Sequence, residues 1–146
     1  MDFSLEVVTI PVSDVGRAKQ FYANLRWRLD IDFSAPGDFR VIQFTPPGPA
    51  CSIALGNGIT TAAPGSVQGL ELVVSDIAAA HADIASRGIA ISDVYHEAKL
   101  AHRASPEGRV PGPDPEGRSY FSFADFADPD GNTWLLQEVT QRAPGR

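Results

Sequence analysis

The chain contains an internal repeat, and this feature constrains its fold more than any other. Val12-Ser13-Asp14 near the start matches Val74-Ser75-Asp76 at an offset of 62 residues. Self-similarity over a segment of this length indicates a duplicated structural unit. We therefore expect two tandem modules, at about residues 5–58 and 67–139, followed by a tail at 140–146.

Each module begins with a stretch of alternating polarity, which predicts a strand with two different faces. The Ser-Asp pair that follows provides side-chain oxygens to cap the start of a helix. Apolar residues then recur at three- and four-residue spacing, as in a helix with one buried face. The predicted strands are 6–12, 28–33, 39–45 and 51–55 in the first module, and 70–74, 89–95, 119–126 and 133–138 in the second. The expected architecture is one α+β domain with the order βαβββ repeated.

Composition limits the classes of partner. The 146 residues are 43% hydrophobic, enough for a substantial core, and carry a net charge of −6. This charge repels phosphate backbones and anionic lipid, so we expect neither nucleic acid nor a membrane as partner. Cys51 is the only cysteine, and Met1-Asp2-Phe3-Ser4 does not read as a secretory signal. These features favour a cytoplasmic protein.

Four short segments occur in a fixed order along the chain. Val12-Ser13-Asp14 is followed by Phe21-Tyr22, then by the echo at Val74-Ser75-Asp76, and Asp128-Pro129-Asp130-Gly131-Asn132 precedes the last strand. Together they resemble the vicinal oxygen chelate superfamily, the fold of glyoxalases, bleomycin resistance proteins and extradiol dioxygenases, over about residues 5–138. The resemblance implies curved mixed sheets around a cup, helices outside the cup, and a homodimer.

Strand parity predicts which side chains line the cup, because alternate residues of a strand point to opposite faces. The apolar alternate residues should pack on the helices. Thr9 and Ser52 of the first module, and Glu71, Leu135 and Gln137 of the second, should then face inward. Most of this wall is small or neutral.

Enzymes of the superfamily hold a divalent metal in the cup. The resemblance places three of the ligand positions at Val7, Gly69 and Leu135, and the fourth at or beside Ser52. The first three side chains cannot bind a metal, whereas a Zn, Fe or Mn site needs about three protein ligands from His, Asp, Glu or Cys. We therefore expect no metal and no other cofactor.

Glu71 and His96 are the candidate catalytic residues. Glu71 is the one carboxylate with inward parity, and it either anchors a cationic or hydroxyl group or pairs with an arginine. His96 either acts as a general acid or base near neutral pH or is a surface residue without a role. A divalent metal at a non-standard site formed by Glu71, His96 and His102 is the alternative to the metal-free expectation.

A long insertion rich in Pro and Gly separates His96 from Arg118, and the first module has no equivalent. Such a loop in a compact domain is typical of a lid or binding loop, although a plain surface excursion is the other interpretation. Arg118 would supply a cation to the lid, and Tyr95 and Tyr120 at its ends would supply aromatic contacts to a planar ligand.

Two functions remain open. The first is a metal-free small-molecule binding protein of the bleomycin-resistance type, which sequesters a drug or metabolite in the cup and so contributes to antibiotic resistance. The second is a glyoxalase-like lyase or isomerase acting on a small oxygenated substrate, by acid–base chemistry or through a relocated metal. The expected ligand-binding residues are Thr9, Ser52, Glu71, Tyr95, His96, His102, Arg118, Tyr120, Leu135 and Gln137.

Overall fold

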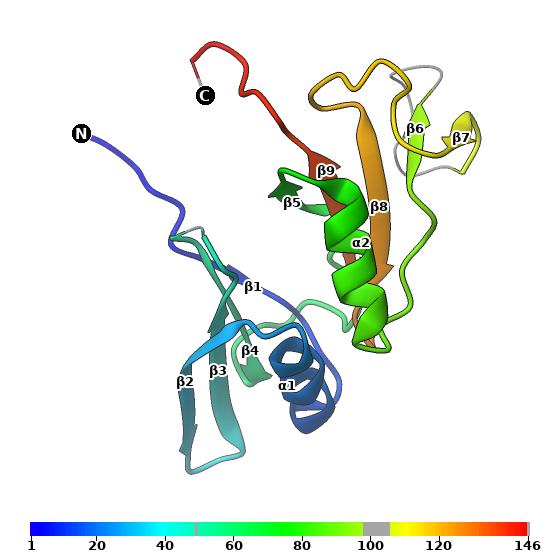
Figure 1. Ribbon diagram of the computed structural model, residues 1–146. Coiled ribbons are helices and arrows are strands. Elements are labelled where there is room, and N and C mark those ends of the chain that lie inside the picture. The colour runs from blue at the N-terminus through cyan, green and yellow to red at the C-terminus, as the bar shows by residue number, and fades with distance from the viewer. Residues whose placement is uncertain (49, 98–105, 146) are drawn as a thin grey trace. The chain divides into compact units, whose positions relative to one another are not determined.

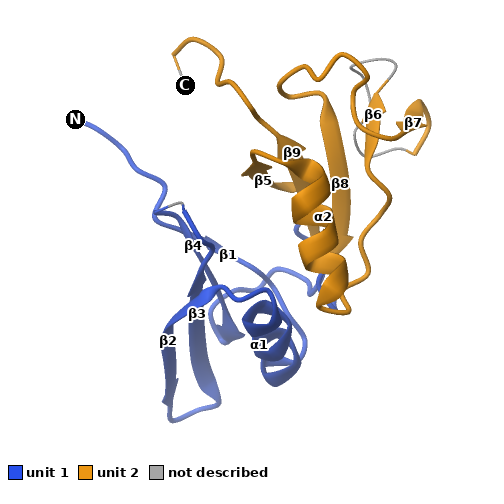
Figure 2. Ribbon diagram, in the orientation of Figure 1, with its two compact units in different colours: residues 1–68, 128–132 blue, residues 69–127, 133–146 orange. Residues whose placement is uncertain are grey.

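The computed structural model describes residues 1–48, 50–97 and 106–145 (Figure 1). The chain forms two compact units, which we call unit 1 and unit 2 (Figure 2). Unit 1 comprises residues 1–68 and 128–132, and unit 2 comprises residues 69–127 and 133–146. No helix in the described ranges is long and apolar enough to cross a membrane.

Unit 1 contains one helix and a four-stranded mixed sheet. The strands lie in the order β1-β4-β3-β2, and only the β1–β4 pair is parallel. Helix α1 covers one face of this sheet, where Tyr22, Ile42 and Phe44 are fully buried. The elements are β1 (Val7–Thr9), α1 (Val15–Asn24), β2 (Arg28–Ala35), β3 (Phe39–Thr45) and β4 (Ser52–Asn57).

Unit 2 repeats this arrangement and adds one strand. Its order is β5-β9-β8-β6-β7, again with one parallel pair, β5–β9. The elements are β5 (Leu70–Val74), α2 (Ile77–Ser86), β6 (Tyr95–Glu97), β7 (Arg109–Pro111), β8 (Ser122–Ala127) and β9 (Thr133–Glu138). Two helices and nine strands in two mixed open sheets, among the described residues, confirm the predicted α+β class.

Both helices begin where the Ser-Asp pairs predicted. The Asp14 carboxylate accepts the Arg17 N–H at 2.9 Å, and the Asp76 carboxylate accepts the Ala79 N–H at 2.9 Å. Each bond satisfies one backbone donor that the first helical turn leaves without an intrahelical partner. The cap residue of each helix is therefore the Asp of its Ser-Asp pair.

Two predicted strands have different bounds. Residues 6–12 were expected in one strand, but β1 ends at Thr9, and Pro11 has no N–H to continue a ladder. Residues 89–95 form only an isolated bridge at Ile91, and β6 starts at Tyr95. The Ser92 hydroxyl accepts the Asp125 N–H at 2.9 Å, which replaces the backbone bond that a regular strand would make there.

The turn at 128–132 belongs to unit 1. The buried Asp128 carboxylate accepts the Tyr22 hydroxyl at 3.0 Å and the Asn132 side-chain amide at 2.8 Å. Asn132 also donates to the Pro11 carbonyl at 2.9 Å. Asp130 accepts both the N–H and the hydroxyl of Ser13. The turn is therefore held by hydrogen bonds to helix α1 at Tyr22 and to the segment before that helix at Pro11 and Ser13.

Candidate functional site

The sheet of unit 2 has a helix-free face, which we define by residues that share register across its strands. Glu71, Leu135 and Asp125 form one row across β5, β9 and β8. Val73, Gln137, Phe123 and Tyr95 form the next row, which extends to β6. Trp134 and Leu136 occupy the opposite face, as strand parity predicted.

The base of this face is apolar and aromatic. Tyr95, Phe123 and Leu135 are less than 7% exposed and form one cluster. The Tyr95 and Phe123 rings stack with centroids 5.7 Å apart. Glu71 and Val73 lie at its exposed margin, and Val73 is 45% exposed. Because Tyr95, Phe123 and Leu135 are buried, the residues of these rows that are open to a ligand are Glu71 and Val73.

A polar clamp holds Tyr95 in place. Its hydroxyl donates to the Asp125 carboxylate at 3.1 Å, and Arg109 pairs with the same carboxylate at 2.7 Å. The Arg109 guanidinium also lies 4.1 Å from the centroid of the Tyr95 ring. Burial, reinforced by the charge of Asp125, raises the pKa of the Tyr95 phenol. Tyr95 is therefore a neutral donor and not a base near pH 7.

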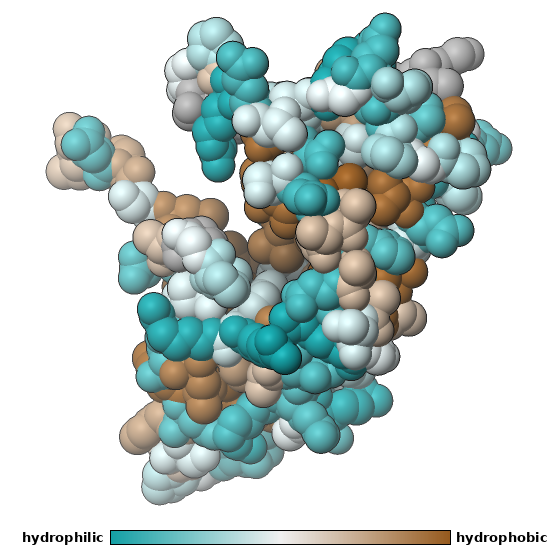
Figure 3. Space-filling model, viewed as in Figure 1, coloured by the Kyte–Doolittle hydropathy of each residue, from teal (hydrophilic) through white to brown (hydrophobic). Residues whose placement is uncertain are grey.

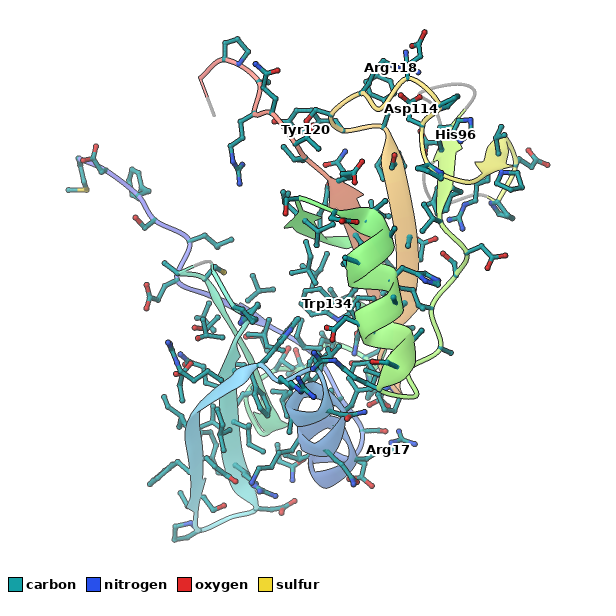
Figure 4. All side chains as sticks on the ribbon, in the orientation of Figure 1. Arg17, His96, Asp114, Arg118, Tyr120 and Trp134 are labelled. Atoms are coloured by element: carbon teal, nitrogen blue, oxygen red, sulfur yellow. The ribbon has the colours of Figure 1, made fainter. Side chains whose placement is uncertain are left out.

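His96 lies on the opposite face of the sheet from Glu71. It pairs with Ser122 and Val110, which alternate with the residues of the helix-free face. Its Nδ1 lies 2.9 Å from the Gly112 carbonyl oxygen, and Figure 4 shows it at the same end of unit 2 as Asp114 and Arg118. The structure does not bring Glu71 and His96 together, so they cannot act as an acid–base pair on one substrate in unit 2.

The insertion is anchored to its own sheet over the part that is described. Residues 109–111 form β7 against β6, an element that the sequence did not predict. The Arg118 side chain donates to the buried Asp114 carboxylate, and its guanidinium lies 4.3 Å from the centroid of the Phe121 ring. The side-chain and backbone hydrogen bonds from Arg118 lower the pKa of Asp114 to about 2. Arg118 is therefore engaged within unit 2.

Tyr120 and Gln137 also make hydrogen bonds that hold the end of the insertion against unit 2. The Gln137 side-chain amide, 4% exposed, donates to the Tyr120 carbonyl at 3.0 Å. The Tyr120 hydroxyl accepts the Ala143 N–H at 2.9 Å. Tyr120 has a φ of 77°, a strained value for a residue with a side chain. These bonds fix the chain between the insertion and β8.

The predicted residues of unit 1 lie on the helix-free face of its own sheet. Thr9 is exposed and pairs in register with Ala54. Ser52 is 4% exposed, and its hydroxyl lies 2.7 Å from that of Thr45. The Thr45 hydroxyl in turn donates to Asp30, which also accepts from Arg28. Ser52 is therefore part of a polar network that parity alone did not identify.

The superfamily's metal positions carry no ligand side chains. Val7 is 42% exposed, Gly69 has a φ of 71°, and Leu135 packs in the aromatic cluster. No group of three or more His, Cys, Asp or Glu residues gathers in the described ranges. His102, the third member of the alternative metal site, lies outside the described residues.

Two residues of the helix-free face were missed by the site prediction: Phe123 and Asp125. Both lie within the predicted strand 119–126, so strand parity could have placed them on a common face. Arg109, a predicted cation of the insertion, could not be assigned to this face, because β7 has only three residues and no alternation that distinguishes it from a loop.

The chain belongs to the glyoxalase/bleomycin resistance protein/dioxygenase superfamily, whose model matches residues 4–136. It is similar to TnmS3, an antibiotic binding protein from Streptomyces sp. CB03234, with 30% identity, coverage of 95% of this chain and 98% of that one, and a TM-score of 0.66. No curated protein matches its sequence.

Two further solved structures are similar over nearly their whole length. A glyoxalase/bleomycin resistance protein from Streptomyces sp. CB03234 shares 30% identity, with 92% of this chain and 100% of that chain covered and a TM-score of 0.63. A member of the same superfamily from Sphaerobacter thermophilus DSM 20745 shares 26% identity, with 94% and 98% covered and a TM-score of 0.66.

Proposed function

We propose that this protein is a metal-free small-molecule binding protein that sequesters a flat aromatic drug or metabolite. The proposal rests on the residue at the last-strand metal position, which is Leu135. In place of a ligand side chain, the last strand contributes an apolar residue that packs with Tyr95 and Phe123. A position filled by a buried apolar side chain cannot bind a metal, so a ligand beside it would be held without one.

The similarity to an antibiotic binding protein supports the same class of function. A binding protein that sequesters an antibiotic lowers its free concentration, so we propose a contribution to antibiotic resistance. We also propose that the protein is cytoplasmic and a homodimer, in keeping with its single cysteine and with the superfamily resemblance.

Glu71 gives the proposed site its selectivity. It lies next to Leu135 in register, at the exposed margin of the aromatic base. A carboxylate there accepts hydrogen bonds and favours ligands that carry an amine or hydroxyl at their edge. A ligand with an acidic edge would be repelled, which separates the proposed ligand class from carboxylated aromatics.

The enzymatic alternative has less support. It required Glu71 and His96 to converge, and their side chains point to opposite faces of one sheet. General acid–base catalysis needs groups within hydrogen-bond reach of the same proton. A binding function does not require these two side chains to converge.

The test uses doxorubicin, a flat fused-ring drug with an amino group and intrinsic fluorescence. Val73→Lys places a cation two residues from Glu71 on the helix-free face and should weaken doxorubicin binding at least about tenfold, because it repels the drug's amino group and competes for the carboxylate. Val110→Lys is the matched control, since Val110 is 37% exposed on the opposite face of the sheet.

The control variant should keep the parental affinity. Equal affinities in both variants, or no binding of doxorubicin or bleomycin by the parent, would remove the proposed site. Mass spectrometry of the recovered drug separates binding from catalysis, and a changed mass would favour the enzymatic alternative.

A further inference from the structure

Two cavities lie at one end of the sheet of unit 1. The first, of about 480 Å³, lies between the first turn of α1 and strands β2 and β3. The second, of about 420 Å³, lies between the chain before α1, the β2–β3 turn and the segment after β4. Asp38 and Asn57 line both cavities. The two therefore form one groove, lined by residues from 11–16, 34–40 and 56–64, which we call the sheet-end groove.

The first cavity of the groove lies on the helix-bearing face of unit 1. Ser34, Arg40 and Asn57 form one row across β2, β3 and β4. Arg40 has the same parity as Ile42, which is fully buried on the face that α1 covers. The cavity is therefore on the opposite face of this sheet from Ser52, and in a different unit from the binding site proposed above. Figure 3 shows mostly hydrophilic atoms over α1 and near the end of the β2–β3 hairpin.

Four polar side chains in the groove are available to a ligand. No hydrogen bond or ion pair within the described residues involves the side chains of Ser34, Asp38, Asn57 and Thr61. Asn57 is half-buried at the end of β4 and has a glycine on each side, so no side chain adjacent in the chain crowds its amide. Asp38 is held in the β2–β3 turn with a φ of 62°, a strained conformation of the kind that clusters at ligand-binding positions.

The charge of the groove excludes an anionic ligand. Arg40 lines the first cavity, but its guanidinium donates two hydrogen bonds to the Asp32 carboxylate, at 3.0 Å and 2.9 Å. Among the described residues, the other charged side chains that line the groove are Asp14 and Asp38. A phosphate or carboxylate group would therefore meet two carboxylates and a cation that is already paired.

The available groups match a ligand that carries neighbouring hydroxyls. The Asp38 carboxylate only accepts hydrogen bonds, whereas the Asn57 carboxamide both donates and accepts. Two adjacent hydroxyls, each of which donates and accepts, satisfy both groups at once. Phe39 lines the first cavity with an apolar ring, which suits the C–H face of a sugar. A concave site with a few convergent polar groups is the usual form of a small-molecule site.

We propose that the sheet-end groove binds a neutral sugar, with Asp38 and Asn57 holding two adjacent hydroxyl groups. The hydroxyls of Ser34 and Thr61 contact the same ligand from the two cavities. This site goes beyond the aromatic ligand proposed for unit 2 and does not depend on it.

The test titrates isotope-labelled, full-length protein with D-glucose, D-galactose and D-mannose and follows its amide NMR signals. These sugars differ in the orientation of single hydroxyls, so a site built to hydrogen-bond hydroxyls should favour one of them. The favoured sugar should shift the signals of the Asn57 side-chain amide and of the Gly58 backbone saturably, with a dissociation constant of about 1 mM.

Two variants test the residues that hold the sugar. Asp38→Gly and Asn57→Asp should each weaken binding of the favoured sugar at least about tenfold, because the first loses a charged acceptor and the second loses the amide donors. Glycine adopts the φ of 62° without strain, so Asp38→Gly should keep or raise the melting temperature. Asp2→Gly removes the same charge outside the groove and should leave the affinity unchanged.

Three outcomes would overturn the proposal. The first is the absence of a saturable shift in the groove with any of the three sugars. The second is parental affinity for the favoured sugar in both Asp38→Gly and Asn57→Asp. The third is saturable binding of D-glucosamine without binding of the neutral sugars, which would identify a site for a cationic amine instead.

Discussion

Replacing Tyr22 with phenylalanine should destabilise the fold by about 1.5 to 2 kcal/mol. The Tyr22 side chain is fully buried, and its hydroxyl donates to the Asp128 carboxylate at 3.0 Å. A hydrogen bond to a charged group contributes about 1.5 to 3 kcal/mol. The lower part of this range applies, because Asp128 keeps three donors, two from Asn132 and the backbone N–H of Asp130.

The aromatic packing around Tyr22 in unit 1 should be retained in this variant. The Tyr22 ring lies 5.4 Å from the Trp27 ring and 6.1 Å from the Phe44 ring, and phenylalanine retains both contacts. Urea unfolding should therefore show a lower midpoint with an unchanged m-value. A loss below about 0.5 kcal/mol, the level of an ordinary surface substitution, would refute the claim that the 128–132 turn stabilises unit 1 through Asp128.

Three further predictions concern unit 2. Glu71→Gln should weaken doxorubicin binding about 10- to 100-fold while stability stays equal or rises slightly; a less stable variant with parental affinity would identify Glu71 as a structural residue. Asp114→Asn should be less stable than the parent at neutral pH. Because Arg118 lowers the pKa of Asp114 from 3.8 to about 2, the carboxylate stabilises the fold above pH 4, and the difference between the two proteins in acid unfolding should vanish as the pH falls through 2. Deleting residues 99–105 should weaken doxorubicin binding at an unchanged melting temperature, whereas a deletion that includes β7 should also lower the melting temperature, because it removes a paired strand; parental affinity in the shorter deletion would show that the insertion is not a lid.

The repeat predicts two modules, about 5–58 and 67–139. The chain forms two compact units, and the first part of unit 1 ends at residue 68. The assignment of 128–132 to unit 1 depends on Tyr22 and Asn132, which are distant in sequence from each other. Contacts of that kind follow from the folded chain and not from periodicity.

Parity predicted the faces of the long strands well. Glu71 and Leu135 share a row, as expected, because residues of one parity stay on one face wherever the ladder is regular. The predicted strand 89–95 is interrupted at Ser92, whose side chain replaces a backbone bond, and β6 starts only at Tyr95. Alternation cannot be extended through such an interruption, so the face of His96 does not follow from the sequence.

The role of the insertion needed three-dimensional information for a different reason. The sequence predicts a ligand contact for Arg118, and the structure shows that its side chain also donates to Asp114, four residues earlier, and contacts Phe121. Sequence identifies a cation and a nearby carboxylate but not which of several partners the side chain meets. The same holds for Arg109, whose contact with Tyr95 depends on the β6–β7 pairing.

Native mass spectrometry of EDTA-treated protein with doxorubicin tests the central claim most directly. The account predicts a complex whose mass equals protein plus drug with no metal, and an affinity that added Zn²⁺, Mn²⁺ or Fe²⁺ does not change. Binding that appears only when a divalent metal is restored, with one equivalent of that metal retained per chain, would contradict it.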